Sequence, residues 1–136
     1  MITEDYVSFE IAKLLKEKGF DEPCAWQYYT YWEGGELKNY ERPVLLDKML
    51  KNSQVIDKDN ATAPTLQMAM KWLREVHKLF IQTWILSENG YWFNIIKLLD
   101  NYYHKDLYST GLKDIYYSTE EEAVEAAIEY CLKHLI

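Results

Sequence analysis

The chain has 136 residues, of which 49% are hydrophobic and 27% are charged, as is ordinary for a soluble globular protein with one core. Its net charge of −7 gives a surface that on average repels nucleic-acid phosphates and anionic lipids. No apolar run approaches the roughly 18 residues that a membrane span needs, and no signal-peptide pattern opens the sequence, so we expect a cytoplasmic protein.

The N-terminal region predicts a helix followed by a hairpin. Residues 5–18 place apolar side chains on one face and charged side chains on another, and Gly19 stands in the helix-ending position. Residues 24–32 alternate as in a strand, so that aromatic rings point to both sides. Glu33-Gly34-Gly35-Glu36 then predicts a tight turn into a short strand from Leu37.

Residues 41–63 carry weaker signals. The apolar group Leu45, Leu46, Met49 and Leu50 indicates one or two helical turns, and polar runs follow it. We expect a partly ordered connection here. Because a loop of this length in a small domain is either mobile or functional, it is also a candidate contact surface.

The stretch from Ala63 to Lys78 predicts the best-defined helix. We expect it to begin at Pro64 or Thr65, since a proline is tolerated in the first turn because its missing N–H would have no partner within the helix. We expect a broad apolar face to be buried, with these members: Leu66, Trp72, Leu73, Val76 and His77. The opposite side carries a basic stripe, which consists of Lys71, Arg74 and Lys78.

A second hairpin follows this helix. Residues 80–86 and 91–99 flank the Ser87-Glu88-Asn89-Gly90 turn, which contains the Asn-Gly pair typical of hairpins. Residues 100–111 predict a polar loop, and residues 112–117 predict a third strand.

The C-terminal segment predicts the last helix. Ser118-Thr119 offers an N-cap, and the glutamates that follow match the positive end of a helix dipole. Its apolar positions include Cys131, which we expect, like Cys24, to be a buried free thiol.

These elements predict an α+β fold in a single domain of residues 1–136. Its order is helix, two strands, connection, helix, three strands, helix, and we expect about three helices packed on one face of an antiparallel sheet of about four or five strands. The parts are a helix and hairpin (1–40), a partly ordered connection (41–63) and a helix-strand-strand-strand-helix part (64–136).

The order from residue 64 onward matches, in outline, that of double-stranded RNA-binding domains. Those domains grip phosphates with lysines at the start of the last helix. This chain has Glu120, Glu121 and Glu122 there, so residue chemistry argues against that function.

No pattern in the sequence predicts a catalytic, cofactor-binding or metal-binding residue. The unexplained feature is an excess of rings, with twelve Tyr, five Trp and four Phe. If helices cover one sheet face, rings on the other face form a candidate surface for a protein partner or a second copy in a homodimer. Its members are Trp26, Tyr28, Tyr29, Tyr31, Trp32, Tyr91, Trp92, Tyr102 and Tyr103. That these rings simply widen the core is an equally open alternative.

Two other functions are left open. A nucleic-acid-associated factor would use the basic stripe of Lys71, Arg74 and Lys78, although the acidic chain makes nucleic acid an unfavourable partner. An enzyme would need His77 or His104 to meet carboxylates through folding.

Three segments of the chain resemble a known group of proteins. They read YVSFEIAKLLKEKGF (residues 6–20), APTLQMAMKWLREVH (residues 63–77) and YSTEEEAVEAAIEYCLKHLI (residues 117–136). The group consists of small uncharacterised proteins of gut Bacteroides-type bacteria, often within prophage or other mobile elements. The resemblance implies a bacterial cytoplasmic setting and an accessory role in phage or element biology, and it carries over no site residues.

Overall fold

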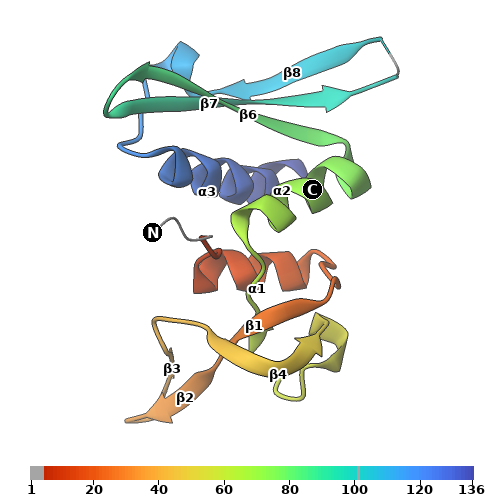
Figure 1. Ribbon diagram of the computed structural model, residues 1–136, viewed down its shortest axis with the longest axis vertical. Coiled ribbons are helices and arrows are strands. Elements are labelled where there is room, and N and C mark those ends of the chain that lie inside the picture. Colours follow the sequence, from red (N-terminus) through yellow and green to blue (C-terminus); the bar gives the residue numbers. More distant parts are fainter. Residues whose placement is uncertain (1–4, 101) are drawn as a thin grey trace. The chain divides into compact units, whose positions relative to one another are not determined.

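The fold was examined in a computed structural model, which describes residues 5–100 and 102–136 (Figure 1). These residues form three α-helices and eight strands, and the strands pair antiparallel in three small sheets. The fold is therefore α+β, as predicted. The expectation of one sheet of four or five strands is not confirmed. The chain divides into two compact units, Met1–Thr65 and Leu66–Ile136.

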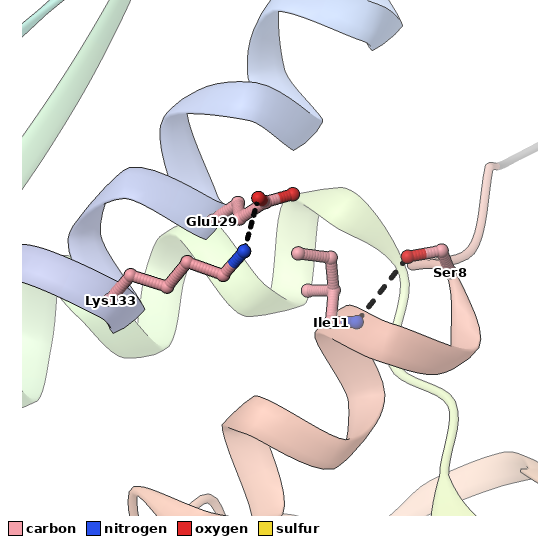
Figure 2. A network of polar contacts seen from close by, with 4 residues as sticks. All are labelled: Ser8, Ile11, Glu129 and Lys133. Atoms are coloured by element: carbon pink, nitrogen blue, oxygen red, sulfur yellow. Dashed lines mark hydrogen bonds and ion pairs between the residues drawn. The ribbon is translucent and has the colours of Figure 1, made fainter.

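Helix α1 (Phe9–Glu17) is the only α-helix of the first unit within the described residues. It begins later than predicted because Ser8 is its N-cap, and the Ser8 Oγ accepts a hydrogen bond from the Ile11 N–H at 3.3 Å (Figure 2). Gly19 follows the helix with φ of +93°, a conformation that glycine adopts without strain. The predicted amphipathic helix and its stop are therefore confirmed, with a corrected start.

The predicted strand of residues 24–32 is two strands in the structure. β1 (Cys24–Tyr28) lies between β4 (Val44–Leu50) and β5 (Ala61–Thr62), whereas β2 (Thr30–Glu33) forms a hairpin with β3 (Glu36–Asn39). The break has a local cause. Thr30 donates from its N–H and its hydroxyl to the Asn60 Oδ1, at 2.9 and 3.0 Å, while Gln27 and Tyr28 pair with β5. The predicted Gly34-Gly35 turn is confirmed.

The segment 41–63, expected to be a partly ordered connection with helical turns, contains β4, a 3-10 turn (Asn52–Gln54) and β5. Leu45 of β4 pairs with Trp26 of β1. Pairing with a strand distant in sequence therefore makes this apolar segment extended instead of helical. The buried Asn52 side chain connects the segment to Phe20 and to β5. Its amide N–H donates to the Phe20 carbonyl at 2.8 Å, and its Oδ1 accepts from the Thr62 N–H at 3.0 Å.

Replacement of Asn52 by alanine is expected to lower the free energy of unfolding by about 2 kcal/mol. It leaves the Phe20 carbonyl and the Thr62 N–H buried without these partners, and each such loss costs at least about 1 kcal/mol. Urea denaturation followed by circular dichroism measures the change. The control is Asn39→Ala, which removes one exposed bond to the Tyr40 carbonyl; equal losses in the two variants would contradict this role.

The second unit contains helix α2 (Leu66–His77), β6 (Leu79–Ser87), β7 (Gly90–Leu98), β8 (His104–Ser109) and helix α3 (Glu120–Tyr130). A π-helical segment (Cys131–Leu135) extends α3. The strands form one sheet in the order β6-β7-β8, and α2 and α3 lie on one face of it (Figure 1). The predicted hairpin of residues 80–99 is confirmed.

The last helix begins as predicted. The Thr119 Oγ accepts from the Glu122 N–H at 3.1 Å, and the Glu122 carboxylate accepts from the Ser118 N–H at 3.2 Å. Farther along the helical segment, the Lys133 ammonium and the Glu129 carboxylate lie 2.7 Å apart, one turn from each other (Figure 2).

The third strand lies earlier than predicted. The structure has β8 where a polar loop was expected, and a 3-10 turn (Gly111–Lys113) within the predicted strand 112–117. Stacking with the Tyr130 ring, at a centroid distance of 3.8 Å, holds Tyr108 of β8 against α3. The Thr110 hydroxyl bonds to both the N–H and the carbonyl of Phe93, which ties the end of β8 to β7. Neither contact is visible in local sequence periodicity.

The apolar face of α2 is narrower than predicted. Leu66, Trp72 and Leu73 are buried, but Val76 is 56% exposed, so its expected burial is wrong. The helix begins at Leu66 rather than at Pro64 or Thr65, because Thr65 pairs with Tyr6 in an isolated β-bridge and Pro64 accepts a hydrogen bond from the Val7 N–H.

Candidate interaction surface

The sheet of the second unit has two unlike faces. Side chains alternate along β7, so that Phe93 and Ile95 point to the helix side and are almost fully buried. Trp92 and Asn94 point to the opposite face, where they are partly exposed. Among the described residues of this unit, α2 and α3 lie on the first face, and no α-helix lies on the second, where the 3-10 turn Gly111–Lys113 contacts Trp92 (Figure 1). The second face is thus a sheet surface that presents side chains outward.

Two tryptophans stack on this open face. Trp84 of β6 stands directly opposite Trp92 of β7, and their rings lie 5.6 Å apart at an angle of 19°. The Trp84 indole N–H donates to the Asn94 Oδ1 at 2.7 Å, and the Asn94 amide donates to the Gln82 Oε1 at 2.9 Å. We call Gln82, Trp84, Trp92 and Asn94 the tryptophan face. Its hydrogen bonds fix the rings and satisfy polar groups that a partner would otherwise have to desolvate.

Exposed apolar side chains follow Trp84 along β6, and alternation places Ile85 on the helix side of the sheet with Thr83, which bonds to Glu120 of α3. Ile85 is 65% and Leu86 is 63% exposed, and Trp84 itself is 48% exposed. A hollow of about 320 Å³ beside Trp84 is lined by Thr83, Ile85, Tyr91 and Glu120. Large exposed apolar side chains that adjoin one another are typical of contact surfaces.

Gly111 supports the back of the Trp92 ring. A Cβ at this position would lie 2.7 Å from Cε3 of Trp92, closer than real Cβ contacts allow. Only a glycine therefore lets the chain pass this close to the indole.

The variant Gly111→Ala is expected to displace the Trp92 ring and to weaken its stacking on Trp84. The near-ultraviolet circular dichroism of the tryptophans should fall, while the free energy of unfolding drops by about 1–3 kcal/mol, as is usual for overpacking. Gly34→Ala serves as the comparison, because nothing lies near a Cβ there although the positive φ adds strain. An unchanged aromatic signal in Gly111→Ala would show that this contact does not position Trp92.

The rings predicted as a surface are distributed over both units. In the first unit, Tyr28 is buried and its hydroxyl donates to the Val7 carbonyl at 2.7 Å, so Tyr28 is a core residue and its assignment to a surface is wrong. Trp26 packs on Tyr6, and Tyr31 packs on Tyr40. Tyr29 is partly buried. Trp32 at the hairpin is 69% exposed.

The second unit holds the other predicted rings. Tyr91 is partly buried, and its backbone forms a bridge with Tyr117, while Trp92 belongs to the tryptophan face. Tyr102 and Tyr103 are exposed between β7 and β8. Sequence analysis missed Trp84. Its position could have been predicted, because the hairpin turn sets the register of β6 and β7 and thereby places residues 84 and 92 opposite each other.

The basic stripe is exposed, but it is not confined to α2. Lys71 and Arg74 lie on the exposed side of the helix, whereas Lys78 follows the helix with φ of +59° and donates to the Glu75 carbonyl. Of the three cations, Lys71 and Arg74 therefore lie on the helix itself, one turn apart.

The histidines and cysteines take separate positions. His77 contacts the edge of the Trp72 ring, and its Nε2 is buried without a hydrogen-bond partner in the described residues; burial is the main cause that lowers the pKa of His77. His104 is exposed on β8. Cys24 and Cys131 are buried thiols outside any disulfide, as predicted, and burial raises the pKa of Cys131 to about 12.

Comparison of the chain with protein-family models, curated proteins and solved structures finds no match. Within residues 5–100 and 102–136, no three potential metal ligands gather at a site. None of the helices in the same residues has the length and apolar character required to cross a membrane.

Proposed function

We propose that the chain is a non-enzymatic protein-interaction module and that the tryptophan face is its contact surface. The observation that carries this proposal is the stacked, partly exposed pair of Trp84 and Trp92 on a sheet face that no α-helix of its own unit covers in the described residues. Tryptophan is enriched among the residues that dominate binding energy, and rigid rings lose little entropy when they are covered. We further propose a cytoplasmic, accessory role in phage or mobile-element biology.

Three features of the tryptophan face favour a protein over a charged ligand. None of its four members is charged, and its amide groups already bond to one another or to the Trp84 indole. Leu86, two residues after Trp84, adds an exposed aliphatic side chain beside it. A surface of this composition gains most from the burial of apolar area.

The test compares variants that each remove one exposed indole. Self-association is measured by light scattering, and binding of host proteins is measured by pull-down with the purified chain. Trp84→Ala should reduce association or capture at least tenfold, whereas Trp32→Ala, which removes the exposed indole of the first unit, should leave it unchanged. Equal behaviour of both variants would contradict the proposal.

A second candidate function is binding of nucleic acid by α2. The exposed Lys71 and Arg74 favour it, because two cations one turn apart can contact successive phosphates. A gel shift at low salt with single-stranded and double-stranded RNA would test it. Loss of a shifted complex in Lys71→Ala with Arg74→Ala would support this function, and no shift in the native chain would exclude this mode of binding.

A further inference from the structure

The free edge of β6 differs from the other sheet edges of the chain. β6 is the outer strand of its sheet, and no other strand in the described residues pairs with its outer side. Its nine residues, Leu79–Ser87, contain no charged residue and no proline. Such an edge presents a row of unpaired backbone N–H and carbonyl groups that can accept another strand.

The other edge strands longer than the two-residue β5 carry charges that hinder pairing. β4 has Asp47 and Lys48 at its centre, and β8 has Lys105 and Asp106. The hairpin strands β2 and β3 carry Glu33, Glu36 and Lys38. Charged side chains at an edge are a common device against unwanted strand addition, and β6 lacks this device although it is among the longest strands.

We propose that β6 pairs antiparallel with β6 of a second copy of this chain, and that the two three-stranded sheets thereby join into one six-stranded sheet. This inference rests on the proposed function, since it names the partner of the tryptophan face. In such a pair the two-fold axis passes between the two copies of one residue, which then face each other. The position of that residue fixes every other contact.

The exposed side chains place the axis at Trp84. With this register Trp84 faces Trp84 of the second copy, Thr83 faces Ile85, and Gln82 faces Leu86. The paired segment then contains the three most exposed apolar side chains of the strand, Trp84, Ile85 and Leu86. The aromatic pair at the axis stabilises adjacent antiparallel strands, and each flanking pair joins a polar with an aliphatic side chain.

A neighbouring register is less favourable. If Thr83 were on the axis, the two copies of Glu120 would approach each other, because the Thr83 hydroxyl donates to the Glu120 carboxylate at 2.9 Å. Like charges near one axis repel. The Trp84 register avoids this approach.

The Trp84 register also continues the ring stack. Trp92 and Trp84 are already stacked in one copy, so the pairing yields a row of four indoles across the six-stranded sheet. A different protein would need its own aromatic strand to extend this row, whereas a second copy supplies one by symmetry. A strand pair about 24 Å long is a small interface, so we expect dissociation in the micromolar range.

A charge exchange at the axis tests the pairing. Sedimentation equilibrium should show a dimer for the native chain and a monomer for both Trp84→Lys and Trp84→Glu, because each variant places like charges opposite each other. An equimolar mixture of the two variants should again associate. Trp32→Lys is the matched control and should remain dimeric, and circular dichroism checks that each variant is folded.

A second pair of variants uses positions that tolerate charge, because Gln82 and Leu86 are both exposed. Gln82→Lys with Leu86→Lys sets lysines against each other and should give a monomer, whereas Gln82→Lys with Leu86→Glu sets opposite charges together and should remain a dimer. A native chain that stays monomeric at about 200 µM, well above the expected dissociation constant, overturns the pairing. If a host protein is still captured through Trp84, the proposed function stands without it. Association that is unchanged by substitution of Trp84 and of Trp92 overturns both the strand pairing and the proposed function.

Discussion

Replacement of Leu73 by alanine is expected to lower the free energy of unfolding by about 2–5 kcal/mol. Leu73 has no exposed surface, and its helix α2 packs against β6 and α3 within the second unit. The substitution removes three carbon atoms and leaves a cavity that a close-packed core closes only in part. Urea denaturation measures the loss of free energy, and the thermal midpoint should fall with it.

Lys71→Ala is the matched control on the same helix. Lys71 is exposed, and alanine has at least as good a helix propensity, so its free energy of unfolding should change by less than about 0.5 kcal/mol. If both variants lost the same stability, the division of α2 into a buried and an exposed side would be wrong.

Local signals predicted the elements that local chemistry determines. Gly34-Gly35 marked the first hairpin, because both residues have a positive φ that few residues other than glycine adopt. Asn89-Gly90 marked the second hairpin by its composition, although neither residue has a positive φ. Thr119 marked the start of α3, because its side chain satisfies a helix N–H. These predictions needed no knowledge of distant contacts.

The missed elements depend on contacts between distant residues. β8 is held by stacking of Tyr108 on Tyr130 and by the bond of Thr110 to Phe93, which lie 22 and 17 positions apart in sequence. The break between β1 and β2 depends in the same way on Asn60. Hydrophobic periodicity does not reveal such distant partners. The third strand of the second unit was therefore predicted at residues 112–117 instead of 104–109, and β1 and β2 were predicted as one strand.

The surface was predicted only in part for a related reason. A count of aromatic residues identifies rings but does not tell which face they take. Tyr28 lies in the central strand of its sheet and is buried with its hydroxyl bonded to the Val7 carbonyl, whereas Trp84 lies on a side of its sheet that no α-helix of its unit covers in the described residues. The register of β6 against β7 places Trp84 beside Trp92, so that the two rings form one continuous surface.

Replacement of Phe93 by alanine should cost about 3–5 kcal/mol of unfolding free energy, as is usual for a buried phenylalanine. Its ring is 1% exposed and packs between Tyr108 and Tyr117, with centroid distances of 5.8 and 5.9 Å. The loss removes the ring contacts that connect β7 with β8 and with the bridge at Tyr117. Urea denaturation followed by tyrosine absorbance measures it.

Trp92→Ala is the comparison that separates folding from binding. Trp92 is the adjacent residue, but alternation places its ring on the open face of the sheet, where it is partly exposed. We expect a smaller loss of stability than in Phe93→Ala together with the larger loss of association, since the stack with Trp84 disappears. A Phe93→Ala variant as stable as Trp92→Ala, or a Trp92→Ala variant that associates like the native chain, would contradict the assignment of one sheet face to the core and the other to a partner.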